Sequence, residues 1–126
     1  PVSGGRISSS FGPRTHPVTK QPSSFHSGID IAGLPIGTPV KATAAGRVIT
    51  ARLSDTAGNY VEIDHGNGYV TRYMHLNTFS VKTGQSVSRG QTLGGLGQTG
   101  RVTGPHVHYE VRLNGVAKDP ALFMNG

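Results

Sequence analysis

Two histidines and one aspartate are the side chains of this sequence best suited to bind a metal ion. His26 and Asp30 lie four positions apart, and His108 ends the distant run Gly-Pro-His-Val-His at 104–108. Two imidazoles and one carboxylate are a usual ligand set for catalytic zinc, and three protein ligands leave the fourth tetrahedral position open to water. The chain has no cysteine, which excludes a structural site built on thiolates. The sequence therefore predicts one catalytic zinc site per chain.

Another histidine belongs beside the metal ligand His108. Side chains along a strand alternate between its two faces, so a strand at 106–112 places His106, His108 and Glu110 on one face. His106 is then positioned to bind substrate or water, or to stabilise a developing oxyanion. Glu110 either orients a histidine that binds the metal or pairs with an arginine, and the spacing does not decide between these two roles.

Three further histidines lie outside these motifs. His75 ends a strand-like run at 69–75 and shares a face with Tyr73, so we predict that His75 faces the cleft and that Tyr73 lines the groove. His65 lies in a turn and is interpreted as structural. His16 lies in an N-terminal loop, where it either rims the cleft or is simply exposed.

The composition fits one basic domain with a single core. The chain has 126 residues, 19 of them glycine, with a formal charge of +6 and a pI near 10.2. Glycine is more frequent than its usual share of about 7%, which favours many tight turns. A basic surface favours polyanionic partners such as nucleic acid, anionic lipid or an anionic cell wall. No apolar run approaches the ~18 residues of a transmembrane helix, so no transmembrane segment is expected in this chain.

Short runs of β-branched and aromatic residues separated by turn signals favour an all-β fold. We predict strands at 40–43, 47–53, 59–65, 69–76, 79–81, 91–96 and 106–113. The run His-Gly-Asn-Gly at 65–68 predicts a hairpin turn, and residues 1–28 are expected to be mostly loop. The expected fold is one antiparallel, sandwich-like domain over residues 1–126, with long N-terminal loops and an active-site groove over the sheet. Because the sequence starts at Pro1 and not at methionine, we expect it to be trimmed from a longer precursor.

Three blocks of the sequence resemble the lysostaphin/LytM family of zinc endopeptidases. The blocks are Phe-His-Ser-Gly-Ile-Asp-Ile-Ala at 25–32 with Gly-Thr-Pro-Val at 37–40, then Ile-Asp-His-Gly-Asn-Gly at 63–68 with Tyr-Met-His-Leu at 73–76, and finally Gly-Gln-Thr-Gly at 97–100 with Thr-Gly-Pro-His-Val-His-Tyr-Glu-Val at 103–111. They follow one another in the order of the family, and the resemblance extends over nearly the whole chain.

The resemblance implies roles for five residues. Residues that match His26, Asp30 and His108 bind one zinc ion in the family, and those that match His75 and His106 serve the catalytic water and the transition state. It also implies hydrolysis of peptide cross-links in bacterial peptidoglycan by a zinc-activated water. Stem-peptide D,D-cross-links are the expected substrate. The expected form is an extracytoplasmic monomer, in the periplasm, in the cell envelope or secreted.

Three other functions remain open at this point. A non-catalytic peptidoglycan-binding or hydrolase-activating module of the same fold would share the charge and the β pattern, although this chain keeps all five family positions. Valine, glycine and leucine recur at every third position from 81 to 93, a pattern that also occurs in biotinyl and lipoyl carrier domains. Such carriers present a modifiable lysine at a hairpin tip, and neither Lys41 nor Lys82 lies in such a turn. Four tyrosines, four phenylalanines and no tryptophan give little support to a nucleic-acid-binding surface, so no nucleic-acid partner is expected.

Overall fold

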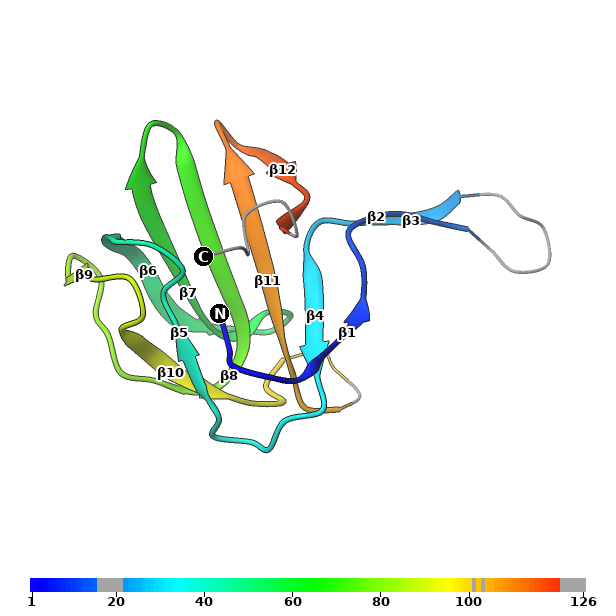
Figure 1. Cartoon of the computed structure of the whole chain (residues 1–126), viewed down its shortest axis with the longest axis horizontal. Coiled ribbons are helices and arrows are strands. Elements are labelled where there is room, and N and C mark those ends of the chain that lie inside the picture. Colours follow the sequence, from blue (N-terminus) through cyan, green and yellow to red (C-terminus); the bar gives the residue numbers. More distant parts are fainter. Residues whose placement is uncertain (16–21, 101, 103, 121–126) are drawn as a thin grey trace.

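The computed structural model describes residues 1–15, 22–100, 102 and 104–120. Its strands form one ten-stranded sheet and one two-stranded sheet, and they pair in antiparallel fashion (Figure 1). The strands are β1 (Arg6–Ser9), β2 (Gly12–Thr15), β3 (Pro22–His26), β4 (Ile29–Ala32), β5 (Pro39–Lys41), β6 (Gly46–Ser54), β7 (Gly58–Gly66), β8 (Tyr69–Phe79), β9 (Ser86–Val87), β10 (Thr92–Leu96), β11 (His106–Leu113) and β12 (Val116–Lys118). The predicted all-β, antiparallel fold is confirmed. Within the described part of the chain, no helix is long and apolar enough to cross a membrane.

The strand β11 lies in the middle of the large sheet, between β4 and β8 (Figure 1). Its register against β4 places His108 directly opposite Asp30, and Val107 opposite Ile31. Its register against β8 places Tyr109 opposite Tyr73. Residues from distant parts of the sequence therefore become neighbours through the strand pairing alone.

The two faces of β11 have different surroundings, as the alternation in the sequence predicted. Val107, Tyr109 and Val111 are at most 2% exposed and lie in the hydrophobic core. The other core residues are Ile29, Ile31, Val40, Ala42, Val48, Val61, Ile63, Tyr73, Leu76, Val81, Val87, Leu93 and Leu96. Each buried aliphatic side chain of this size stabilises the fold by about 1.5–3 kcal/mol. Apolar burial on one face thus fixes the direction of the polar residues on the other.

Tyr73 belongs to this core and not to a groove, which corrects the prediction from the sequence. Its side chain is fully buried, and its ring lies 5.3 Å from that of Tyr109, between centroids. Its hydroxyl is hydrogen-bonded to Thr71 Oγ1 (2.9 Å), to Thr43 Oγ1 (3.1 Å) and to the Thr43 amide, which donates at 3.2 Å. Burial raises the pKa of the Tyr73 phenol, so the group remains a neutral, structural hydrogen-bonding partner.

The hairpin turn predicted at 65–68 is confirmed between β7 and β8. Gly66 and Gly68 have φ angles of 86°, and Asn67 has a φ of 55°. These left-handed values suit glycine and asparagine, because other side chains meet the following carbonyl there. The ring of His65, just before the turn, is hydrogen-bonded through Nδ1 to the Ala45 carbonyl (2.8 Å) and through Nε2 to a threonine hydroxyl (2.7 Å). Both nitrogens are therefore engaged within the fold, in line with a structural histidine.

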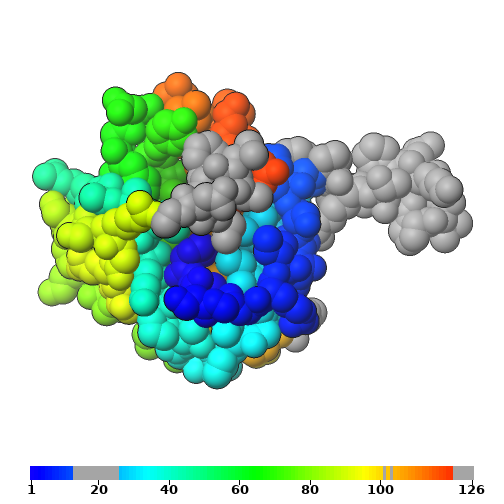
Figure 2. All heavy atoms as spheres, viewed as in Figure 1, coloured from blue at the N-terminus to red at the C-terminus, as the bar shows by residue number. Residues whose placement is uncertain are grey.

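The first 28 residues contain strands that the sequence did not predict. The strand β1 pairs with β4, and β2 pairs with β3 as a separate ribbon beside the main sheet (Figure 1). Prolines at 13, 17 and 22 hid the ribbon, because proline is rare inside strands. The N-terminal segment, dark blue in Figure 2, lies on the surface of the face shown there. There the Pro1 carbonyl accepts a hydrogen bond from the Lys41 amide at 2.6 Å.

The structural role of Tyr73 predicts a loss of stability without a loss of metal binding. We expect Tyr73→Phe to lower the free energy of unfolding by about 1–3 kcal/mol, because one group of Thr71 and two of Thr43 lose their hydrogen bond to the buried hydroxyl. Tyr109→Phe should cost less, since the Tyr109 hydroxyl has a single hydrogen bond within the described part of the chain, with Thr43 Oγ1 at 2.8 Å. Denaturant unfolding and bound zinc would be measured for both variants. If the Tyr73→Phe protein had unchanged stability but bound less zinc, the structural role would be wrong and Tyr73 would belong to the metal site.

Candidate metal centre

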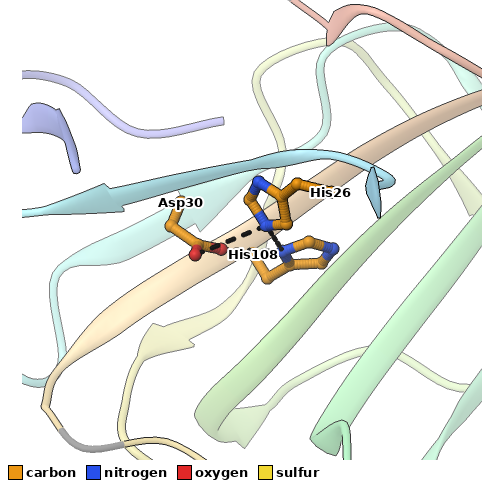
Figure 3. A group of neighbouring side chains, drawn as sticks. All are labelled: His26, Asp30 and His108. Carbon is orange, nitrogen blue, oxygen red and sulfur yellow. Dashed lines mark hydrogen bonds and ion pairs between the residues drawn. The ribbon is translucent and has the colours of Figure 1, made fainter. Parts of the chain in front are cut away.

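Three different strands supply the candidate metal ligands. His26 is the last residue of β3, Asp30 lies in β4, and His108 lies in β11. Figure 3 shows the three side chains pointing toward one another. One ligand atom from each lies within 4.8 Å of the others. The structure therefore brings together the three residues that the sequence selected.

The spacing of the three ligand atoms fits a tetrahedral metal ion. His26 Nε2 lies 3.3 Å from His108 Nδ1 and 3.5 Å from Asp30 Oδ2, and His108 Nδ1 lies 2.7 Å from Asp30 Oδ1 (Figure 3). Zinc bonds of about 2.0–2.1 Å at tetrahedral angles place ligand atoms roughly 3.3 Å apart. The group therefore needs changes of at most about 0.6 Å in these distances, the largest between His108 Nδ1 and Asp30, to hold zinc.

The remaining ring nitrogens of both histidines have partners that set the tautomer. His26 Nδ1 lies 2.8 Å from the Ser10 carbonyl, to which it donates its proton. His108 Nε2 lies 2.8 Å from Glu110 Oε2 and donates to that carboxylate. In the neutral rings, His26 Nε2 and His108 Nδ1 then carry the lone pairs, and these are the two atoms that converge. Such partners orient metal ligands and increase their basicity.

The short link between His26 and Asp30 depends on a glycine. A side chain at Gly28 would overlap the Tyr109 carbonyl and approach Glu110 Cγ to 2.9 Å. The absence of a Cβ lets the connection between β3 and β4 lie directly against β11. The bend at Gly28 thus brings together two ligands that lie four residues apart in the sequence, one at the end of β3 and one in β4.

Glu110 has both of the roles that the sequence left open. Besides His108, its carboxylate accepts hydrogen bonds from Ser27 Oγ (2.8 Å), Arg112 Nε (2.9 Å) and Arg72 Nη1 (3.4 Å). Burial by itself raises the pKa of this carboxyl, but the bonds to His108 and Ser27 outweigh it and lower the pKa to about 2. Glu110 is therefore an ionised, nearly buried anchor that holds a ligand ring in place.

Asp30 and His108 form a close ionic pair in the metal-free chain. Burial lowers the pKa of His108, but the hydrogen bonds to Asp30 and Glu110 outweigh it and raise the pKa to about 9. Burial likewise raises the pKa of Asp30, yet the bond to His108 brings it below its ordinary value. At neutral pH a proton therefore lies between His108 Nδ1 and Asp30, where a metal ion would replace it.

His75 faces the metal ligands and not the side of Tyr73, which corrects the predicted face. The ring centroid of His75 lies 4.9 Å from that of His106 and 6.3 Å from that of His108. Its Nδ1 donates to the Thr99 carbonyl at 2.7 Å, which leaves Nε2 with the lone pair. Burial lowers the pKa of His75, so the ring is neutral at neutral pH.

A bulge in β8 turns His75 to this side of the sheet. Asn59 pairs with Leu76 and Val61 pairs with Tyr73, so β8 has one more residue than β7 between these pairs. His75 itself has a φ of 65°, which breaks the alternation of an ideal strand. Thr99, which sequence reasoning missed, supports this conformation: its Oγ1 donates to the Leu76 carbonyl at 2.6 Å. The only local signal for Thr99 was its place in a glycine-rich turn.

His106 lies on the same face as His108, as predicted, and also points its Nε2 toward the ligands. Its Nδ1 donates to the Gly104 carbonyl at 3.0 Å, and its Nε2 lies 3.7 Å from Asp30 Oδ1. With Nδ1 donating to a backbone carbonyl in each ring, His75 and His106 thus turn Nε2 toward the three ligands. This arrangement can accept a proton from water and then donate hydrogen bonds to an oxyanion. His16, the remaining candidate, lies outside the described residues.

Two surface cavities adjoin the metal centre. The first, of about 560 Å³, is called here the β1-side cavity, and it is lined by Arg6, Ser8, Ala32, Gly33, Leu34, Gly104, Pro105 and His106. The second, of about 330 Å³, is called the β6-side cavity, and it is lined by Arg52, Ser54, Thr56, Ala57, Tyr60, Arg72, Met74, His75 and His108. Each cavity includes at least one of the histidines described above, so an extended ligand can reach the centre from either side.

Known proteins resemble this chain over most of its length. The model of "Peptidase family M23" matches residues 24–120. "Peptidoglycan DD-endopeptidase ShyA" of Vibrio cholerae is 57% identical over 111 residues, which are 87% of this chain and 25% of that protein. "DD-carboxypeptidase/endopeptidase Mpg" of Neisseria meningitidis is 47% identical over 115 residues, which are 91% of this chain and 26% of that protein. The chain thus spans about a quarter of the length of these curated relatives.

Solved structures share the whole fold. A zinc-containing peptidase from Vibrio cholerae superposes with a TM-score of 0.86 at 45% identity, over 100% of this chain and 38% of that one. The catalytic domain of lysostaphin from Staphylococcus simulans superposes with a TM-score of 0.84 at 32% identity, over 97% of this chain and 93% of that one. By the family match, by these identities and by its fold, the chain belongs to peptidase family M23.

Proposed function

We propose that this chain is a zinc-dependent endopeptidase domain that hydrolyses peptide cross-links of bacterial peptidoglycan. The observation that carries the proposal is the convergence of His26 Nε2, the Asp30 carboxylate and His108 Nδ1 within 4.8 Å. The donor set of two imidazoles and one carboxylate suits zinc and leaves one position open. His75 and His106 stand beside the ligands, each with Nδ1 bonded to a backbone carbonyl and Nε2 directed to the site.

The chain's own residues divide the chemistry between binding and proton transfer. When bound, zinc makes a water molecule more acidic and polarises the carbonyl that is attacked. His75 and His106 each hold a proton on Nδ1 and turn Nε2 to the site, so either can take the proton of the attacking water. The same ring, once protonated, can stabilise charge on the carbonyl oxygen or pass the proton to the leaving amine. We propose that the two histidines share these roles.

The relatives support peptidoglycan stem peptides as the substrate. The names of ShyA and Mpg describe endopeptidases with DD specificity, and we propose D,D-cross-links for this chain too. Its charge of +6 favours an anionic cell wall by long-range attraction. Action on that substrate would place the domain outside the cytoplasm, in the periplasm, at the envelope or secreted, and we propose that it acts there as a monomer.

A non-catalytic wall-binding or activating module is the rival function. The described site argues against it, because a module that only binds has no need for three converging ligand atoms and two further oriented histidines. His75 and His106 are oriented by the Thr99 and Gly104 carbonyls. A module that only binds the wall would lose no function if these two histidines were absent. The rival therefore becomes an outcome of the activity test.

The central prediction is zinc-dependent release of soluble muropeptides from purified peptidoglycan. The zinc-loaded chain should consume D,D-cross-linked dimers, and a chelator or His108→Ala should abolish this, because each removes the metal. Products would be separated by liquid chromatography and their new termini identified by mass spectrometry. One bound zinc per chain with no release from several wall types would instead favour the binding or activating module.

The two histidines that do not belong to the ligand set should separate zinc binding from turnover. We expect His75→Ala and His106→Ala to retain zinc but to lose about 100-fold or more in kcat, because each removes a proton-transfer group. His65→Gln is the matched control, since His65 lies in the hairpin and should keep both zinc and activity. Metal analysis would accompany kinetics on a soluble cross-linked peptide. Normal turnover by either alanine variant would reject that residue's assigned role.

Zinc binding should release a proton from the chain at neutral pH. His108 has a pKa of about 9 without metal, so it is protonated at pH 7 and must lose that proton to bind zinc. The apparent affinity should therefore rise about tenfold per pH unit up to pH 9 and then level off. Calorimetry at pH 7 in buffers of different ionisation enthalpy would count the proton. Zinc binding with no released proton would contradict the Asp30–His108 ionic pair.

A further inference from the structure

Arg52 and Arg72 line the β6-side cavity, and they differ in whether their charge is paired with a carboxylate. Arg72 forms ion pairs with Glu62, at 2.6 Å from Nε to Oε2, and with Glu110, at 3.4 Å from Nη1 to Oε1. Arg52 forms no ion pair with any carboxylate in the described part of the chain. The positive charge of Arg72 is therefore compensated within the protein, whereas that of Arg52 remains available to a ligand.

The guanidinium of Arg52 is nevertheless held in position by Tyr60. Its Nε donates to the Tyr60 hydroxyl at 2.9 Å, and its Cζ lies 5.8 Å from the centre of the Tyr60 ring. Tyr60 is 7% exposed, so its packing fixes the position of the hydroxyl that Arg52 contacts. With Nε engaged, the two terminal nitrogens of Arg52 remain as a fork of donors, the geometry that suits a carboxylate. A cation fixed in this way loses little conformational freedom when a ligand binds.

A D,D-cross-link carries a negative charge close to the bond that is cleaved. The nitrogen of the scissile amide is attached to an α-carbon of D configuration, and that carbon also bears a carboxyl group. Two bonds separate this carboxyl group from the amide nitrogen, so it lies roughly 3 to 4 Å from the attacked carbonyl carbon. A protein cation that reads this group must lie next to the metal centre. A glycine bridge has an amide at the corresponding place and no charge.

We propose that Arg52 binds this α-carboxylate and determines specificity for D,D-cross-links that carry it. The β6-side cavity joins Arg52 to His75 and His108, so a cross-link whose leaving amine lies there can reach both the cation and the reacting groups. The inference rests on the proposed function and narrows its substrate. Cross-links with a free carboxylate beside the scissile amide are preferred over amidated cross-links and over glycine bridges.

Arg6 is the competing cation, because it lines the β1-side cavity with His106. Its charge also has no carboxylate partner in the described part of the chain. Unlike Arg52, it has no aromatic hydroxyl that fixes its guanidinium among the described contacts. Arg52 is therefore the better-prepared receptor, and the two arginines make opposite predictions about which side of the centre holds the leaving amine.

The test compares two soluble D,D-cross-linked peptides that differ only in the group beside the scissile amide, a carboxylate or a carboxamide. The zinc-loaded chain should have a kcat/KM about tenfold higher for the carboxylate, the size expected for a charge-assisted hydrogen bond. Arg52→Gln should remove this preference by slowing the carboxylate substrate alone. Arg52→Lys should keep a smaller preference, because it retains the charge without the fork. Tyr60→Phe should also reduce the preference, since it frees the guanidinium.

Arg47→Gln is the matched control, because it removes the same charge from the same strand β6 at an exposed position outside both cavities. It should keep the full preference. Equal hydrolysis of both peptides by the unmodified chain, or equal slowing of both by Arg52→Gln, would overturn the role of Arg52 and leave the proposed function intact. Loss of the preference in Arg6→Gln only would assign the carboxylate to the β1-side cavity. Hydrolysis of neither peptide would overturn the proposed function and this inference with it.

Discussion

The pairing of β11 with β4 is the constraint on which the site depends. It sets His108 opposite Asp30, and a slip of one residue would turn every side chain of β11 to the other face. Such a slip would move Val107 and Tyr109 among the polar groups of the metal centre and place a histidine and a glutamate in the apolar core. The free-energy cost of that exchange keeps β11 in its register against β4. The hydrophobic core on one face of the strand therefore positions the metal ligands on the other face.

Glu110, which supports the ligand His108, must itself be compensated by positive charge, and this requirement fixes residues further from the metal centre. Glu110 is 3% exposed, and its negative charge is satisfied by His108, Arg72 and Arg112. An ionised carboxylate at such a depth is stable only with partners of this kind. Arg72, which lines the β6-side cavity with His75 and His108, is thereby committed to structure. The other arginine of this cavity, Arg52, has no carboxylate partner among the described residues, and this difference separates a structural cation from one that can bind substrate.

Local patterns in the sequence were sufficient for the ligands but not for every neighbour. His106 and His108 lie in β11, whose alternation is regular, so their common face could be predicted. His26 and Asp30 could be selected by residue type and spacing alone, since they lie on two different strands. The same alternation failed between Tyr73 and His75, because a bulge against β7 and a positive φ intervene. Those features arise from contacts with distant segments, among them the Thr99 carbonyl. The β2–β3 ribbon was missed for a different reason, since it forms a two-stranded sheet of its own and contains prolines at 13 and 22.

His108 differs from His75 and His106 in the group that accepts a hydrogen bond from its outer ring nitrogen, the nitrogen that faces away from the metal centre. The outer nitrogen of His108 donates to an ionised carboxylate, which makes the ring a stronger base and a better ligand for a cation. The outer nitrogens of His75 and His106 donate to neutral backbone carbonyls. Burial then lowers the pKa of His75, which suits a group that must pick up a proton and release it again within one turnover. The acceptor behind the ring thus distinguishes His108 from His75 and His106. His26 also donates to a backbone carbonyl, and its place at the end of β3, beside Asp30, is what makes it a ligand.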